Sequence, residues 1–143
     1  MSADQVWAPR VLSLFRIIIG LFFLQHGLSK LFGFPHDALF DHMTPLFWVA
    51  GTIETVGSIL LILGLFTRPA AFIMSGEMAV AYFMVFAPRG FFPELNRGEL
   101  AALYCFIFFF IFVAGAGPWS LDALLRRGRV ADEAPYAAGP RRA

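Results

Sequence analysis

The sequence predicts an all-α integral membrane protein, a single domain built as a bundle of four helices that cross a bilayer. Of its 143 residues, 59% are hydrophobic and only 15% are charged, and the mean hydropathy is +0.71. A soluble domain of this size needs more charge to cover its surface. The net charge of +1, without a basic stripe interleaved with aromatic residues, excludes nucleic acid as a partner. The expected partner is therefore the lipid bilayer.

Four apolar segments are long enough to be spans, since a hydrocarbon core of roughly 30 Å needs about 20 residues of helix. They cover residues 11–31, 46–66, 69–86 and 99–115. The fourth is the clearest, because no charged residue lies between Leu100 and Leu121. We expect residues 11–118 to form the membrane domain, after an N-terminal segment of residues 1–10. The first segment is a retained span rather than a cleaved signal peptide, because polar residues interrupt it and no small-residue cleavage site follows.

The breaks between the spans predict how the helices are joined. Only four residues separate Gly64 from Pro69; glycine suits a helix end and proline a helix start, so the second and third spans form a tight antiparallel hairpin. Asn96 and Glu99 have the spacing of a capping box that would begin the fourth span. The glycines and proline that end at Pro118 would terminate it.

The segments outside the spans are predicted to lie at the surface. Trp119 suits a membrane interface, and residues 119–127 form a short interfacial helix in which Asp122 and Arg126 have i,i+4 spacing. Residues 128–143, rich in Ala, Pro, Gly and Arg, form a disordered tail.

The count of Lys and Arg on each side predicts that both termini are cytoplasmic, because cytoplasmic loops carry an excess of these residues. The inner side then holds eight: Arg10, Arg16, Arg68, Arg126, Arg127, Arg129, Arg141 and Arg142. The outer side holds three: Lys30, Arg89 and Arg97.

Four charged residues fall within the spans, where a charge near the bilayer centre costs about 2.5–3.5 kcal/mol on insertion scales. They are Arg16, Lys30, Glu54 and Glu77. Depth estimated from the helical rise predicts that Arg16 pairs with Glu77, and that Lys30 or His26 pairs with Glu54.

These charges lie on a packing face rather than being scattered. On the first span, the face follows 4,3,4,3 spacing through Arg16, Gly20, Phe23, Gly27 and Lys30. On the second span, Gly51, Glu54 and Ser58 share a face. Small residues allow membrane helices to approach closely, so the predicted charged seam lies between helices.

Several readings of this seam stay open. Its ion pairs can hold the helices in register, it can bind a ligand or protons, or Lys30 can extend to the outer headgroups. A solvated loop explains His36, Asp37, Asp41 and His42 better than a metal site does, and packing accounts for Tyr104 and Cys105. No phosphate-binding, nucleophile or zinc motif is present, so we expect neither a metal nor catalytic activity.

Short motifs spread over residues 11–125 resemble the DoxX family of small bacterial membrane proteins. The motifs are Arg16-Ile-Ile-Ile-Gly20, Phe23-Leu-Gln-His26-Gly27-Leu-Ser-Lys30-Leu-Phe-Gly33, Gly51-Thr-Ile-Glu54-Thr-Val-Gly57-Ser58, Leu63-Gly64-Leu-Phe-Thr67-Arg68-Pro-Ala-Ala71, Asn96-Arg-Gly98-Glu99-Leu-Ala-Ala-Leu-Tyr104 and Gly117-Pro118-Trp119-Ser120-Leu121-Asp122. Ser58 and Arg97 stand where the family often has glycine.

The resemblance implies a four-helix membrane bundle in the bacterial inner membrane and, more loosely, a role in a redox system. Members resemble subunits of quinol oxidase and thiosulfate:quinone systems or partners in thiol and oxidative-stress systems. We therefore expect an accessory protein that contacts a quinone or a redox partner through a seam. The candidate seam residues are Arg16, His26, Lys30, Glu54, Glu77, Asn96 and Glu99. The alternatives are a small proton-coupled permease, which would need to oligomerise, and a purely structural partner.

Overall fold

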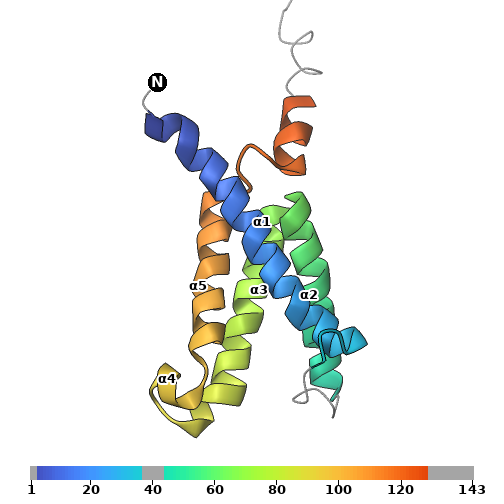
Figure 1. Ribbon diagram of the computed structural model, residues 1–143, viewed down its shortest axis with the longest axis vertical. Helices are drawn as coiled ribbons and strands as arrows, with labels where there is room; N and C mark the ends of the chain where they lie inside the picture. Colours follow the sequence, from blue (N-terminus) through green and yellow to red (C-terminus); the bar gives the residue numbers. More distant parts are fainter. Residues whose placement is uncertain (1–2, 37–43, 129–143) are drawn as a thin grey trace, which may run out of the picture.

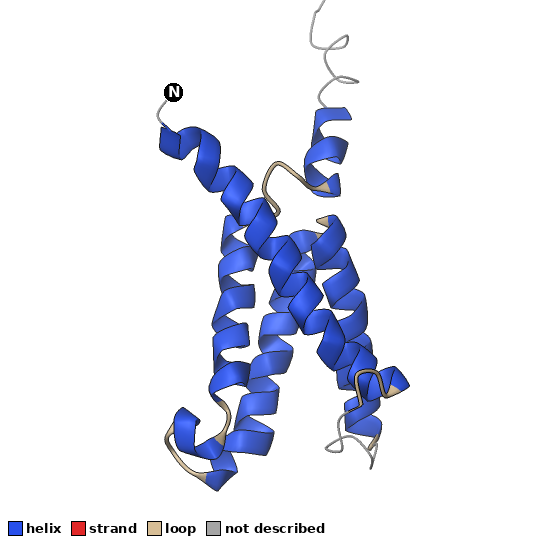
Figure 2. Cartoon of the chain, viewed as in Figure 1, coloured by secondary structure: helices blue, strands red, loops and turns tan. Residues whose placement is uncertain are grey.

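The computed structural model describes residues 3–36 and 44–128, and within these ranges every regular element is a helix (Figure 2). The long helices are α1 (Ala3–Phe32), α2 (Pro45–Leu63), α3 (Thr67–Ala81) and α5 (Glu99–Ala114). Between α3 and α5 lie three short elements: a π-helical turn η2 (Tyr82–Phe86), a 3₁₀ turn η3 (Ala87–Arg89) and α4 (Pro93–Asn96). A last helix covers residues 121–128. The all-α class is confirmed.

Three helices in the described residues are long and apolar enough to cross a membrane: Val6–Phe32, Pro45–Leu63 and Thr67–Arg89. The fourth predicted span is an apolar helix, α5, but it has only 16 residues. The chain runs up and down, with α2, α3 and α5 side by side and α1 crossing them obliquely (Figure 1). α1 begins at Ala3, well before the predicted start of the first span.

The tight hairpin between α2 and α3 is confirmed. Gly64 caps α2 in the left-handed conformation with φ of 66°. Its N–H donates to the Leu61 carbonyl at 3.1 Å, and the N–H of Leu65 donates to Leu60 at 3.0 Å. These two hydrogen bonds form a Schellman motif, which favours glycine at the left-handed residue. The next helix begins three residues later, at Thr67.

α1 packs on α2 through the predicted face of small residues. A Cβ placed on Gly27 would lie 2.7 Å from the backbone nitrogen of Thr55, and one on Gly20 would lie 3.3 Å from the Ser58 carbonyl. Arg16, Gly20 and Gly27 are all buried. The backbones of the two helices are therefore in close contact, as small residues permit.

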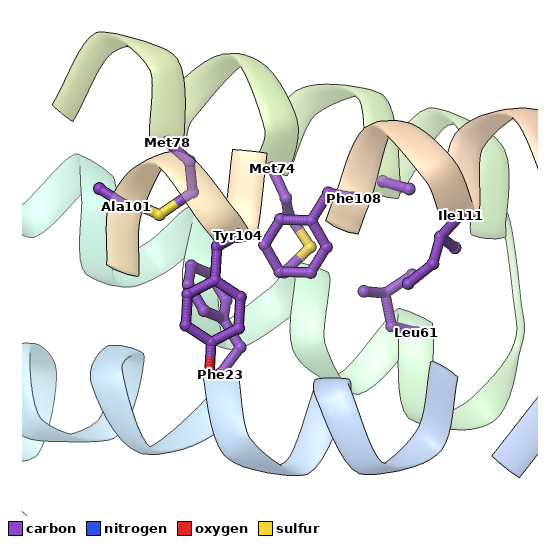
Figure 3. Packing of buried hydrophobic residues seen from close by; sticks show 9 residues of the cluster. Phe23, Leu61, Met74, Met78, Ala101, Tyr104, Phe108 and Ile111 are labelled. Atoms are coloured by element: carbon purple, nitrogen blue, oxygen red, sulfur yellow. The ribbon is translucent and has the colours of Figure 1, made fainter. Parts of the chain in front are cut away.

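The apolar core lies where α1, α2, α3 and α5 meet (Figure 3). Each of the long helices contributes to it: Phe23, Leu61, Met74, Met78, Ala101, Tyr104, Phe108 and Ile111. Phe23 packs edge-on against Phe108, with ring centroids 4.8 Å apart. Most other large apolar side chains are exposed on the outside of the helices, which is the arrangement expected of a protein surrounded by lipid rather than water.

The capping-box prediction for Asn96 and Glu99 is wrong. Asn96 ends α4, and Gly98 rather than Asn96 occupies the cap position of α5. The Asn96 Oδ1 accepts the N–H of Gly98 at 2.7 Å, so the side chain closes a local turn before the helix. Arg97 follows with φ of 62°, a left-handed conformation that glycine adopts at lower cost.

The surface helix after α5 is present, but its predicted internal ion pair is not. Asp122 directs its carboxylate at the backbone of another helix, and the Arg126 Nε donates to the Asp122 carbonyl instead, at 3.3 Å. The predicted disordered tail lies outside the described residues from 129 onward. So do Asp37, Asp41 and His42 of the predicted polar loop; His36 is exposed.

Substituting Gly27 should test the close approach of α1 and α2. Gly27→Ala should lower the free energy of unfolding by about 1–3 kcal/mol, since the new methyl must displace backbone. Gly76→Ala is the matched control: Gly76 is also helical, with nothing within 4 Å of an added Cβ, so stability should hold or rise by about 0.5–1 kcal/mol. Both are read by thermal unfolding in detergent, and equal effects would contradict the predicted contact.

Candidate functional site

An ion pair between α1 and α2 lies at the centre of the candidate site. The Nζ of Lys30 is 2.5 Å from the Oε1 of Glu54, and the two side chains are 11% and 1% exposed. This confirms the predicted pairing of Lys30 with Glu54. Because a single uncompensated charge is very costly in such surroundings, each partner depends on the other.

Glu77 of α3 joins this pair, and the three residues Lys30, Glu54 and Glu77 are called the charged cluster below. The Glu77 carboxyl interacts with that of Glu54 and with the Lys30 ammonium. The reason is the hairpin: Glu54 lies ten residues before Gly64, and Glu77 lies ten residues after Thr67. At 1.5 Å per residue both stand ~15 Å from the turn, at the same level.

The charged cluster retains unused hydrogen-bonding capacity. The Oε2 atoms of Glu54 and Glu77 are buried and receive no hydrogen bond from a donor group among the described residues, so the two carboxyls interact with each other instead. The hydroxyl of Ser58, one turn after Glu54 on α2, is also buried without a hydrogen-bond partner in the described part of the chain. Buried polar atoms normally have partners, and an unsatisfied one points to a water, an ion, a proton or a ligand. The cluster can therefore accept hydrogen bonds from a further group.

Aromatic rings lie beside the charged cluster. His26 is one turn before Lys30 on α1, and its ring centroid is 6.0 Å from that of Tyr104 and 5.6 Å from that of Phe23. Tyr104 in turn stacks on Phe108 at 5.7 Å, with the rings 19° from parallel. We call Phe23, His26, Tyr104 and Phe108 the aromatic stack. His26, predicted as an alternative partner of Glu54, thus has two rings as its neighbours.

Together the charged cluster and the aromatic stack offer three kinds of chemistry. Lys30 supplies a cationic donor, Glu54 and Glu77 supply acceptors or exchangeable protons, and the rings, three of them buried, supply apolar surroundings. In the described part of the chain, no group of three or more His, Cys, Asp or Glu side chains is placed to hold a metal ion.

Arg16 does not pair with Glu77, and that prediction is wrong. Its Nε donates to the Ala116 carbonyl at 2.9 Å and its Nη2 to the Trp119 carbonyl at 2.7 Å. Its Nη1 donates to the carbonyls of Leu61 and Ile62 in the last turn of α2. Carbonyls at a helix end have no partner within the helix and attract a cation. Arg16 thus binds a helix end, although it is fully buried.

Asp122 completes this arrangement from the segment that follows α5. Its two carboxylate oxygens accept the N–H groups of Phe66 and Thr67, each at 2.9 Å, at the start of α3. The N–H of Asp122 donates to the Gly64 carbonyl at 2.9 Å. We call Arg16, Asp122 and the backbone groups they bind the end joint. It fastens the α2–α3 turn to α1 and to the segment after α5.

Asn96 and Glu99, the remaining predicted seam residues, do not take part in the charged cluster. Asn96 is buried and donates to the Gly90 carbonyl at 2.9 Å, so it holds the turn before α5. Glu99 is exposed at the first position of α5. The structure therefore brings Lys30, Glu54 and Glu77 together and leaves Arg16, Asn96 and Glu99 in structural or surface positions.

Sequence reasoning missed the role of Asp122 and one contact of Tyr104. The packing prediction for Tyr104 is confirmed, since it is buried in the core, and its ring also contacts His26. Its spacing from Phe108 was the available signal, since residues four apart share a helix face. Asp122 was assigned to an internal ion pair of its own helix. Its position two residues after Ser120, in a helix-starting segment, gives no indication that it binds the start of α3.

Comparison with known proteins gives a consistent result. A family model described as DoxX matches residues 11–87. An uncharacterized protein from Haemophilus influenzae (strain ATCC 51907 / DSM 11121 / KW20 / Rd) is 48% identical over 131 residues, which cover 85% of this chain and 96% of that protein. No solved structure matches.

Removing Arg16 should destabilise the protein strongly. Arg16→Gln leaves buried carbonyls without donors, so the free energy of unfolding should fall by more than about 3 kcal/mol. Arg10→Gln is the control: Arg10 lies on the same helix but is exposed, 5.6 Å from the Trp7 ring, and should change stability by less than about 0.5 kcal/mol. Denaturant titration in detergent measures both, and similar losses would argue against the end joint.

Proposed function

Because the chain belongs to the DoxX family, we propose that it is a multi-pass protein of the bacterial inner membrane that serves as an accessory or partner subunit of a membrane redox system. It has no catalytic activity of its own in this proposal. The family and the three long apolar helices indicate a membrane protein. The redox role rests on the chemistry of the charged cluster and the aromatic stack.

The proposed topology has four spans, with both termini in the cytoplasm. α5 is antiparallel to α3 and packs beside it (Figure 1), which supports its role as a fourth span. Its 16 residues rise ~24 Å, a little less than a hydrocarbon core of roughly 30 Å. The eight Lys and Arg residues counted on the inner side against three on the outer side support the orientation.

The observation that carries the redox proposal is the placement of two buried carboxyls, Glu54 and Glu77, in contact with each other beside the Lys30 ammonium. Ionisable residues inside a membrane protein often mark a ligand or proton site.

A quinone headgroup fits these residues. Its carbonyl oxygens accept hydrogen bonds, which the Lys30 ammonium can donate, and the hydroxyls of its reduced form can donate to Glu54 and Glu77. Its flat ring can lie against the half-buried ring of His26. When bound, a quinone exchanges electrons and protons; this chain would bind and orient it, and hold protons on the two carboxyls. A redox-protein partner would supply or remove the electrons.

Quinone binding tests the proposal directly. The purified full chain in detergent should bind a short-chain ubiquinone or menaquinone analogue in an equilibrium titration. Lys30→Met, Glu54→Gln and Glu77→Gln should each weaken binding by about tenfold or more, the value of a hydrogen bond to a charged group. Glu99→Gln, an exposed carboxyl on α5, is the matched control and should bind as the parent chain does.

Two results would contradict the proposal. One is a folded chain that binds no quinone analogue and yields no redox partner on crosslinking in membranes. The other is a loss of affinity in Glu99→Gln equal to that of the cluster variants. If the cluster variants lose only stability, the purely structural role is favoured.

The same two buried carboxyls favour a second function, proton-coupled transport. Two buried groups that exchange protons are common in transport pathways. In proteoliposomes with an imposed pH gradient, the chain would then dissipate the gradient by a flux of protons. Glu54→Gln together with Glu77→Gln should abolish that flux. A flux that survives in the double variant would exclude this function. Since one copy has few helices for a pathway, this function would also require a homo-oligomer.

A further inference from the structure

A groove at the end of the bundle opposite the charged cluster is independent of the proposed function. It has a volume of about 850 Å³ and lies between the N-terminal part of α1, the start of α3, the end of α5 and the helix over residues 121–128. Leu12, Phe66, Phe110 and Leu125 contribute apolar walls. Two of the elements that line it, the N-terminal part of α1 and the helix over residues 121–128, lie at the same end of the molecule (Figure 1).

Two arginines line this groove and are not neutralised by carboxylates among the described residues. Arg68 and Arg126 are both exposed. The guanidinium of Arg68 lies 3.6 Å from where a Cβ on Gly115 would stand, and both residues line the groove. Asp122, the one acidic residue in the lining, already accepts two backbone N–H groups of α3. The groove therefore carries excess positive charge.

A buried hydroxyl in the lining also lacks a partner. Thr67 is 1% exposed, and its Oγ1 has no hydrogen-bond partner among the described residues. It lies next to Arg68 in the lining. A polar atom buried to this degree normally has a partner, and the Thr67 hydroxyl is left without one at the edge of the groove.

We infer that this groove binds an anionic phospholipid, with the phosphate between Arg68 and Arg126 and the acyl chains along the apolar walls. The occupant has to be anionic at one end, to match the two arginines, and apolar along its length. It also has to reach a groove at the end of membrane helices. A phospholipid meets all three conditions. Basic pockets between membrane helices bind anionic headgroups in this way, and guanidinium groups suit phosphate oxygens.

Lipid titrations followed by native mass spectrometry test the inference. The full chain in a nonionic detergent should bind phosphatidylglycerol more tightly than phosphatidylcholine. Arg68→Gln and Arg126→Gln should each weaken phosphatidylglycerol binding about fivefold, the effect expected for one basic residue near anionic lipid. Arg127→Gln removes the same charge from the same helix but does not line the groove, and should leave the affinity unchanged.

Arg68→Lys and Arg126→Lys guard against a simple loss of folding, because they keep the charge and should retain most of the affinity. The inference is overturned if phosphatidylglycerol and phosphatidylcholine bind equally, or if Arg127→Gln weakens binding as much as the groove variants. It is also overturned if the groove variants bind phosphatidylglycerol as the parent does, the result expected if another segment or a second copy fills the groove. Quinone binding by these variants stays as in the parent chain, which separates this test from that of the proposed function.

Discussion

The hydrogen bonds of Arg16 are the interaction on which the rest of the structure depends. The carbonyls that Arg16 binds are buried beside its guanidinium, so water does not reach them and they must find donors in the protein. One guanidinium supplies donors to the end of α2 and to the segment after α5. Asp122 does the reverse for the start of α3. These two residues hold α1, the hairpin and the last helix in one arrangement, and the charged cluster is positioned by that arrangement.

Much of the fold was predictable because the bilayer imposes a simple pattern. Long apolar segments, the turn at Gly64 and the small-residue face of α1 all follow from local sequence, and the structure has them. The capping of α5 was not predictable in this way: Asn96 and Glu99 have capping-box spacing, but Arg97 adopts a left-handed conformation that ends α4 between them. A sequence pattern cannot show that a short helix intervenes.

The candidate site was predictable in part, and the error is instructive. The depth of each charged residue in the bilayer, counted from the ends of its predicted span, places Arg16 beside Glu77. α1 is longer than expected and oblique, so Arg16 meets the end of α2 instead. Measuring both carboxyls from the α2–α3 turn would have placed Glu54 and Glu77 together. The relative depth of residues on two neighbouring helices is estimated better from a tight hairpin than from a span boundary, because few residues fix the register of the hairpin.

The symmetric placement of Glu54 and Glu77 about the turn restricts insertions and deletions within α2 and α3. The two residues are 23 positions apart, and each added residue within a helix rotates everything beyond it by about 100°. One insertion on either arm would turn a carboxyl out of the bundle and toward lipid. Substitution is open at many positions of α2 and α3, whereas insertion and deletion are not.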